Sequence, residues 1–251
     1  MTSSPAPGRA RISLVIPAYN EEALLPRLLD SVDVAARTWV ARGGTLEVVV
    51  ADNASTDDTA QIASVRGCRV VRVERRRIAS ARNGGAAAAD GEVLAFVDAD
   101  SRIHPDTLVA VDRAMRDPRV IAGATGVRLE RRSPGIVATW LLLIPLVILL
   151  RMDTGVVFCR REDFDAVGGY DERRAFGEDV QFLWDLRRRG RTRGQRLVRL
   201  RGTKALASTR KFDRHGDWHY FTSLLRLAPL IVRDPSATTE FAERYWYDDD
   251  R

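Results

Sequence analysis

Two aspartates one residue apart, Asp98 and Asp100, follow a short apolar run at residues 93–97. The run is rich in β-branched and aromatic side chains, which is typical of a strand buried on both faces of a mostly parallel sheet. In an open α/β sheet, ligands bind beyond the carboxyl ends of the strands. Two carboxylates at that place can share a hard divalent cation with a diphosphate. The same pair is also found in ordinary solvated turns, so its chemistry depends on the other motifs.

The first hundred residues contain the elements that would position these aspartates. Apolar runs at 12–16, 46–51 and 69–73 precede the run at 93–97, and helical patterns lie between them. This order predicts β-α-β-α-β-α-β, the nucleotide-binding half of a doubly wound α/β fold. Neither G-x-G-x-x-G after the first strand nor G-x-x-x-x-G-K-[ST] is present, which excludes the dinucleotide fingerprint and the P-loop.

Residues between these runs carry turn and cap signals. Pro17 is expected to end the first strand, because it has no backbone N–H for the ladder. Asn20 is the predicted N-cap of a helix that runs to about residue 42, and Ser55 or Thr56 is the predicted N-cap of the next helix.

The second half of the chain has a less regular pattern. We expect strands at 120–129, 155–159 and 197–200, and helices at 105–115, 161–167, 178–189 and 221–232. Residues 11–235 therefore form one predicted domain, with a nucleotide-binding half at 11–101 and a second half at 102–235. Residues 1–10 are a lead-in without the apolar core of a signal peptide, and residues 236–251 are a tail.

The composition indicates a soluble globular protein, with 45% hydrophobic and 29% charged residues. The net charge of +6 favours phosphates, nucleotides or anionic lipid heads as partners, and no nucleic-acid recognition motif accompanies it. Cys68 and Cys159 are far apart and lack metal-ligand spacing. They are predicted to be reduced cysteines of a cytoplasmic protein.

The most apolar segment lies at residues 136–150. It is shorter than the roughly 20 residues that a membrane-spanning helix needs, and Pro145 interrupts it. The favoured interpretation is a buried helix or a homodimer interface. The alternative is peripheral contact with the inner face of a membrane, which would suit a lipid-linked acceptor.

Six motifs follow one another along the chain: SLVIPAYNE (13–21), ADNASTDD (51–58), ARNG (81–84), FVDAD (96–100), CRREDFDAVGGYD (159–171) and GEDV (177–180). Their order and spacing, over roughly residues 11–215, give the chain a close resemblance to family 2 glycosyltransferases, the inverting nucleotide-sugar enzymes of the GT-A fold. The resemblance implies a Rossmann-like, mostly parallel sheet flanked by helices, with a smaller mixed region on the acceptor side. It makes residues 102–235 the expected acceptor-binding half.

The resemblance also implies a role for each matched position. The donor would be bound by residues from five segments: Pro17, Tyr19, Glu21, Asp52, Arg82, Asn83, Asp98, Arg210 and Lys211. Within this set, Tyr19 would lie against the base, Asp52 would accept its imide N–H, and Arg210 with Lys211 would close over the diphosphate.

The remaining roles concern metal and acceptor. Asp100 would ligate Mg²⁺ or Mn²⁺, Asp179 would be the general base, and Glu178 would orient it or bind the acceptor. Each assignment has a simpler structural alternative. Tyr19 could be a packing residue, Asp52 could start a turn, and Arg82 could lie on a helix surface. The acids at 178–179 could only complement a helix dipole, and the basic segment could be a solvated charge run.

The function expected from these motifs is metal-assisted, inverting sugar transfer from a UDP- or GDP-sugar to a hydroxyl or lipid-phosphate acceptor. A nucleotidyltransferase is one alternative, but such enzymes usually carry a Gly-rich, Lys-bearing loop where this chain has Pro17–Glu21. A non-catalytic nucleotide-binding module is another. Such a module would be expected to have lost Asp100 or Asp179, and both are present.

Overall fold

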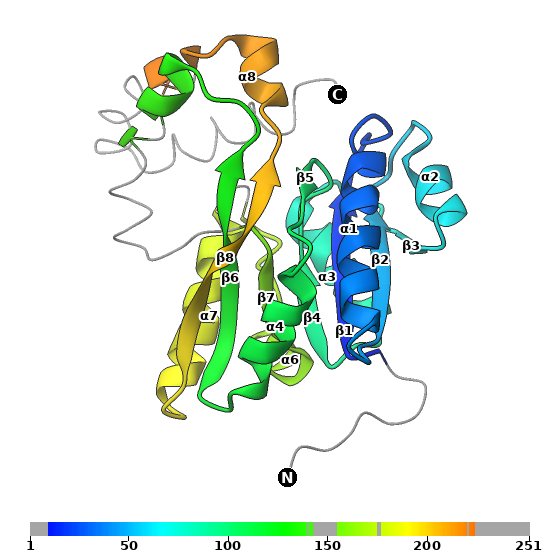
Figure 1. Cartoon of the computed structure of the whole chain (residues 1–251), viewed down its shortest axis with the longest axis vertical. Coiled ribbons are helices and arrows are strands. Elements are labelled where there is room, and N and C mark those ends of the chain that lie inside the picture. Colours follow the sequence, from blue (N-terminus) through cyan, green and yellow to red (C-terminus); the bar gives the residue numbers. More distant parts are fainter. Residues whose placement is uncertain (1–9, 140, 143–154, 175–176, 220, 224–251) are drawn as a thin grey trace.

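A computed structural model describes residues 10–139, 141–142, 155–174, 177–219 and 221–223. One sheet of eight strands, in the order β3-β2-β1-β4-β7-β6-β8-β5, runs through this part of the chain (Figure 1). Helices pack on both of its faces, so the molecule has three layers.

The first half is the predicted β-α-β-α-β-α-β unit. Its four strands are parallel: β1 (Ile12–Ala18), β2 (Leu46–Asp52), β3 (Arg69–Arg72) and β4 (Val93–Phe96). Its helices are α1 (Leu25–Val40), α2 (Thr59–Val65) and α3 (Ile78–Ala88). Because the strands are parallel, their carboxyl ends meet at one edge of the sheet, which we call the carboxyl edge.

The second half extends the sheet with mixed strand directions. Strand β7 is antiparallel to both β4 and β6, whereas β8 is parallel to β6. The elements are β5 (Ser101–Arg102), α4 (Thr107–Arg116), β6 (Val120–Leu129), β7 (Val157–Arg160), α6 (Arg161–Val167), α7 (Glu178–Arg191), β8 (Arg196–Ala207) and α8 (Arg210–His215). The expected combination of a mostly parallel sheet and a mixed region is confirmed.

Two hydrophobic cores fill the space between the sheet and its helices. One contains the apolar faces of α1 and α4, and the other contains those of α3, α6 and α7. In the second core, four aromatic rings pack together, with the Tyr170 and Phe182 centroids 4.2 Å apart and the Phe96 and Tyr170 centroids 5.2 Å apart. This aromatic cluster, Phe96, Phe164, Tyr170 and Phe182, joins strand β4 to helices α6 and α7.

The predicted helix caps were wrong. Helix α1 begins at Leu25 without a side-chain cap. Asn20 instead has a φ of 50°, and its Oδ1 accepts the backbone N–H of Thr56 at 2.9 Å. Helix α2 begins at Thr59, whose N–H is accepted by Asp57 at 3.0 Å. The loops after β1 and β2 lie side by side at the carboxyl edge, so Asn20 bridges the two loops and does not cap α1, whereas Asp57 bonds to the first residue of its own helix.

Several predicted boundaries were also wrong. Strand β1 includes Pro17 and ends at Ala18, and α1 ends at Val40. Strand β8 has twelve residues, because it continues along the sheet margin past a shift in its register with β6. Charged residues at its outward positions hide the apolar pattern, so the predicted strand was too short. The polar segment after it contains the short helix α8.

The apolar segment at 136–150 is described only in part. Ile136 and Thr139 are buried, whereas Val137, Leu141 and Leu142 are 39–61% exposed. Its other residues, the lead-in before residue 10 and the tail lie outside the described residues. In the part of the chain that the structure describes, no helix combines the length and apolar character needed to cross a membrane.

A close approach of α3 to the sheet depends on Gly85. A Cβ at this position would lie 2.4 Å from Cγ1 of Val15 and 3.3 Å from Cβ of Ala51. Gly85→Ala should therefore destabilise the protein by about 1–3 kcal/mol, although alanine is the better helix former. Urea unfolding measures the effect, and Ala87→Gly at an exposed position of the same helix gives the cost of helix propensity alone. A stabilised Gly85→Ala variant would contradict the packing argument.

Candidate active site

The centre of the candidate site is the buried guanidinium of Arg82, which projects from α3. It lies 2.8 Å from Asp98 Oδ1, beyond the end of β4, and 2.7 Å from Glu178 Oε1. It also lies 2.8 Å from Oδ1 of Asp179, so three carboxylates surround one cation. We call these four residues the Arg82 cluster.

Charge and burial in the Arg82 cluster determine its protonation. Only 5% of the Arg82 side chain is exposed, and its guanidinium lies 5.1 Å from the centre of the Tyr170 ring. Burial disfavours the charged form of Arg82, but the surrounding carboxylates outweigh burial and raise its pKa. Arg82 is therefore a permanent cation at this position.

Asp179 is the carboxylate of the cluster whose pKa is raised into the range that suits a catalytic base. Burial is the main cause that raises its pKa, the negative charges of Glu178 and Asp98 add to it, and Arg82 opposes them; the net result is a pKa of about 7. Three carboxylates share a single cation, so the cluster has an excess of negative charge near neutral pH. A carboxyl group with a pKa near 7 can accept a proton from a hydroxyl group at physiological pH.

Both carboxylates of α7 are in the first turn of that helix. Gly177 precedes the helix in a left-handed conformation, with a φ of 71°. The helix amino terminus favours negative charge, so the dipole role considered from the sequence is present together with the ion pairs to Arg82. The Glu178 side chain is 11% exposed and the Asp179 side chain 19%, so Asp179 is the more accessible of the two.

Tyr19 and Asp52 lie at the ends of adjacent strands, where the resemblance predicts the nucleotide base. Asp52 is buried, its Oδ1 accepts the N–H of Ser55 at 3.1 Å, and its Oδ2 lies 3.6 Å from a nitrogen of Arg72. The turn expected as the alternative role of Asp52 is thus present, and it uses only one carboxylate oxygen. The Tyr19 ring is covered by the guanidinium of Arg76, 4.2 Å from the ring centre.

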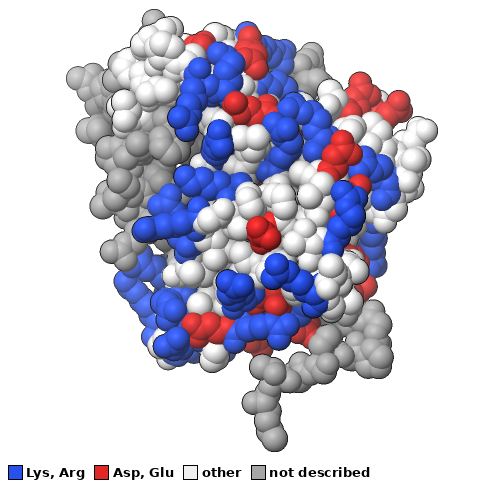
Figure 2. Space-filling model, viewed as in Figure 1, with Lys and Arg blue, Asp and Glu red and all other residues white. Residues whose placement is uncertain are grey.

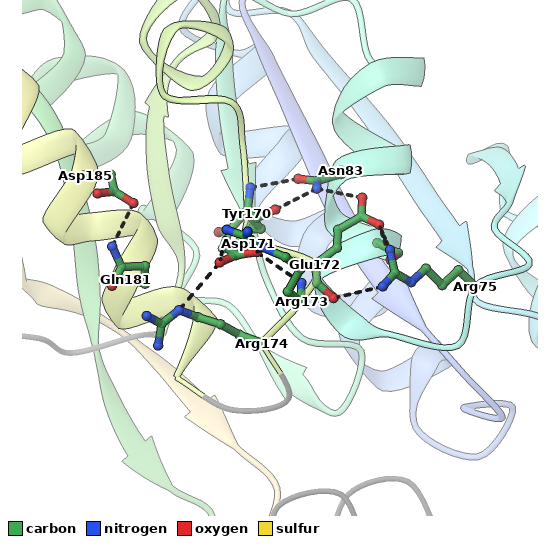
Figure 3. A network of polar contacts seen from close by, with 10 residues as sticks. Arg75, Asn83, Tyr170, Asp171, Glu172, Arg173, Arg174, Gln181 and Asp185 are labelled. Atoms are coloured by element: carbon green, nitrogen blue, oxygen red, sulfur yellow. Dashed lines mark hydrogen bonds and ion pairs between the residues drawn. The ribbon is translucent and has the colours of Figure 1, made fainter. Parts of the chain in front are cut away.

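Asn83 faces away from the Arg82 cluster. Its Oδ1 accepts the N–H of Tyr170 at 2.9 Å, and its Nδ2 donates to the carbonyl of Tyr170 and to Glu172, each at 2.9 Å. Glu172 also accepts hydrogen bonds from Ser80 and Arg75 (Figure 3). These bonds tie the loop between α6 and α7 to α3, so Asn83 positions that loop.

A second group of charges lies where α8 follows β8. Arg210 forms two hydrogen bonds with the buried Glu21, at 2.8 and 3.0 Å. Burial lowers the pKa of Arg210, but Glu21 and the nearby charge of Asp100 produce a net increase. Glu21, Asp100 and Arg210 are therefore neighbours, although the chain separates Glu21 from Arg210 by 189 residues. Lys211 belongs to α8, and its side chain is outside the described set.

The structure thus brings predicted residues together in three places. These are the Arg82 cluster, the group of Glu21, Asp100 and Arg210, and the pair of Tyr19 and Asp52 at the strand ends. Pro17 is buried within β1, opposite Ala51. Arg76 and Glu172 were missed as site residues by the sequence reasoning. The signals for them were the three arginines at 75–77, directly after the third strand, and the glutamate that follows the matched GGYD.

The acids after β4 are suited to a hard divalent cation. Asp98 has 46% of its side chain exposed, and Asp100 is half-buried. Among the described residues, no group of three or more His, Cys, Asp or Glu is arranged to hold a metal. One or two carboxylates, with the remaining positions filled by phosphate oxygens and water, is the usual way in which Mg²⁺ binds together with a nucleotide. Asp100 fits that arrangement.

Comparison with solved structures identifies the class of fold. The mannosyltransferase PcManGT from Pyrobaculum calidifontis, solved in complex with GDP-Man and Mn²⁺, has a TM-score of 0.63 and 22% identity, and covers 96% of this chain and 71% of its own. Glucosyl-3-phosphoglycerate synthase from Mycobacterium tuberculosis, in complex with Mn²⁺, UDP and glucosyl-3-phosphoglycerate, has a TM-score of 0.59 and 24% identity, over 87% of this chain and 80% of that one. The fold is that of GT-A glycosyltransferases.

The sequence then places the chain within that class. The model of glycosyl transferase family 2 matches residues 13–202, and the chain belongs to this family. The resemblance seen in the six motifs is confirmed.

Curated relatives match over part of their length. Validoxylamine A glucosyltransferase of Streptomyces hygroscopicus subsp. limoneus is 38% identical over 127 residues, which are 46% of this chain and 27% of that protein. Undecaprenyl-phosphate 4-deoxy-4-formamido-L-arabinose transferase of Pseudomonas paraeruginosa is 34% identical over 130 residues, 49% of this chain and 37% of that protein. The chain thus spans well under half of each relative.

The raised pKa of Asp179 predicts a pH-dependent effect on stability. A carboxyl with a folded-state pKa near 7, against an ordinary 3.8, favours folding at low pH and loses that contribution as the pH rises through 7. Asp179→Asn, which resembles the protonated acid, should be more stable than the native protein at pH 8, by at most about 4 kcal/mol. The difference should shrink towards pH 4.

Chemical unfolding at a series of pH values measures this difference. Asp185→Asn, farther along α7, controls for the removal of one negative charge from the same helix. A difference between Asp179→Asn and the native protein that does not change with pH would contradict the raised pKa.

Proposed function

We propose that this chain transfers a sugar, with inversion, from a nucleotide diphosphate sugar to a hydroxyl or phosphate of an acceptor. The observation that supports this most directly is Asp179, a carboxyl with a pKa near 7 at the carboxyl edge of a sheet of the GT-A class. Arg82 pairs with both this carboxyl and Asp98. Asp98 follows β4, and the donor is expected beyond the end of that strand.

The proposed reaction has one displacement step. Asp179 accepts the proton of the acceptor hydroxyl while the acceptor oxygen forms a bond to the anomeric carbon. The bond from that carbon to the diphosphate oxygen breaks, and the nucleoside diphosphate leaves with the electron pair. A single displacement inverts the anomeric configuration, and it requires one base on the acceptor side. An acceptor phosphate that is already ionised would not need this proton transfer.

The leaving diphosphate needs positive charge, because it gains negative charge as the bond breaks. Arg210 is the first residue of α8, and it lies close enough to Asp100 for that carboxylate to help raise its pKa. We assign Arg210 and Lys211 to the diphosphate. A Mg²⁺ or Mn²⁺ ion at Asp100 would supply further positive charge to the same phosphates.

Nucleotide recognition is assigned to the strand-end pair. Asp52 has one carboxylate oxygen outside its turn, which would accept the imide N–H of a base. A base that stacks on the Tyr19 ring competes with Arg76 for the face that Arg76 covers. The two similar structures are complexes with GDP-Man and with UDP, which supports a nucleotide diphosphate sugar as donor.

The acceptor is assigned to the side of the cluster that α7 forms. Glu178 neighbours Asp179 and would orient it or contact the acceptor. The Pseudomonas relative is named for an undecaprenyl-phosphate substrate, and this supports a lipid phosphate as one acceptor class. A sugar hydroxyl is the other class.

Asp179→Asn should abolish most of the turnover and retain donor binding. Loss of a general base costs typically 100- to 10,000-fold in rate, whereas the donor contacts are unchanged. In the native protein, kcat/KM should rise with pH to a plateau, with its midpoint near pH 7, because Asp179 must be ionised. Sugar-transfer kinetics and calorimetry of nucleotide binding measure the two effects. Asp185→Asn is the matched control, and substantial turnover by Asp179→Asn would refute the assignment of the base.

A thermal-shift panel of UDP-, GDP- and dTDP-sugars, with and without Mn²⁺, tests the donor assignment. A nucleotide that binds the native state raises the melting temperature by mass action. We expect one nucleotide class to give a metal-dependent shift of several degrees, and Asp100→Ala to remove the metal dependence. If Asp100→Ala leaves that dependence unchanged, Asp100 is not the metal ligand.

A further inference from the structure

The positive charge of this protein is concentrated in one segment. Residues 186–212 contain eleven Arg and Lys residues and no Asp or Glu. The whole chain has a net charge of +6, so this segment alone carries more positive charge than the net charge of the protein. It comprises the second half of α7, strand β8 and the start of α8.

The outward face of α7 carries a tryptophan beside arginines. The buried side of the helix consists of Phe182, Leu183, Leu186 and Gly190. Trp184, Arg188 and Arg191 recur at positions i, i+4 and i+7, which lie on the opposite side of the helix. Trp184 is 43% exposed, and 80% of the Arg188 side chain is exposed.

Strand β8 continues this basic face. Arg189 lies 2.9 Å from Asp163 of α6, so it marks the flank of α7 that faces α6. Arg187 is about 160° away from Arg189 around the helix. It therefore lies on the opposite flank, towards β8. Along β8, Leu197 packs into the same core as α7. The exposed Arg199 follows Leu197 at a two-residue interval on that side of the strand, and the exposed Arg201 follows where the pairing of β8 with β6 becomes irregular.

Figures 1 and 2 show the setting of this surface. Strand β8 lies at the margin of the molecule, beside α7 (Figure 1). The space-filling view looks onto the α1 and α4 side of the sheet, and basic side chains are seen along the margin where α7 and β8 lie (Figure 2).

Few acids neutralise the segment. Asp163 is buried and pairs with Arg189 and Arg193, Asp117 pairs with Arg196, and Glu21 pairs with Arg210. Asp185 lies 4.0 Å from Arg188. Within the described residues, the structure shows no ion pair to Arg191 or Arg201. These two arginines therefore present charge to a partner without first breaking a contact inside the protein.

We propose that the surface made by Trp184, Arg187, Arg188, Arg191, Arg199 and Arg201, the α7–β8 basic face, docks on the surface of an anionic lipid membrane. Arginines bind phosphate headgroups, and an indole ring is favoured at the boundary between headgroups and acyl chains. Surfaces that bind single-stranded nucleic acid usually carry several stacking aromatics.

This docking surface differs from the apolar segment at 136–150, and the proposal does not depend on the proposed reaction. It does give that reaction a location. Helix α7 begins with Glu178 and Asp179, so docking along its outer face brings the carboxyl edge beside the membrane.

The test is co-sedimentation of the full chain with vesicles of phosphatidylcholine alone or with 30 mol% phosphatidylglycerol. The native protein should bind the anionic vesicles, and binding should weaken as salt is raised. The triple variant Arg187→Glu, Arg188→Glu and Arg191→Glu should lower the partition coefficient on the order of 100-fold, because each basic residue near the surface contributes about fivefold. Trp184→Ser should lower binding several-fold even at high salt.

A matched triple variant has the same change in net charge on the other face of the sheet: Arg37→Glu, Arg42→Glu and Arg113→Glu, on or next to α1 and α4. It should bind anionic vesicles much more strongly than the α7 variant. Circular dichroism verifies that both variants fold.

Four results would overturn the proposal. The first is an equal loss of binding in the two triple variants, and the second is equal binding of the native protein to neutral and anionic vesicles. In the third, Leu141→Ser and Leu142→Ser abolish binding, whereas the α7 variant binds like the native protein. The fourth is binding to single-stranded DNA without binding to vesicles, which would assign the surface to nucleic acid.

Discussion

The placement of the candidate site depends on one buried charge. A guanidinium that is removed from water must be paired, and Arg82 is paired with carboxylates from two other parts of the chain. This requirement holds α3, the loop after β4 and the start of α7 in one arrangement. Burial in this arrangement, together with the negative charges of Glu178 and Asp98, raises the pKa of Asp179 towards neutrality. A single constraint thus stabilises the edge of the sheet and prepares a proton acceptor there.

The packing around this cluster makes the arrangement rigid. The antiparallel strand β7 connects the parallel half to β6, and the aromatic cluster fills the core beneath α6 and α7. Asn83, one residue after Arg82, uses its amide to bind both backbone groups of Tyr170. The loop before α7 is therefore fixed to α3 by hydrogen bonds, and the start of α7 is fixed to the same helix by ion pairs. Both sets of contacts place Asp179.

Helix α7 has a different role on each of its faces. Its first turn supplies two carboxylates to the carboxyl edge, its inner face packs on the sheet, and its outer face carries Trp184 among arginines. Elsewhere many arginines are matched with acids, as in the pair of Arg210 with Glu21. The α7–β8 basic face is less neutralised. A helix that bears both the proposed base and the proposed membrane contact would fix the orientation of the reaction at the lipid surface.

The sequence alone determined the parallel β-α-β-α-β-α-β half and the acids after its strands, because apolar runs of strand length and the turn residues behind them are local signals. The order of motifs was enough to place the chain in its family. The extent of β8, the crossing of cap side chains between loops and the burial of Arg82 were decided only by tertiary structure. Arg82 and Asn83 are neighbours in the sequence, yet one joins the carboxylates and the other holds a loop 87 residues away. Such roles depend on which distant segments meet, and local pattern carries no information about the low-polarity environment that gives Asp179 its pKa.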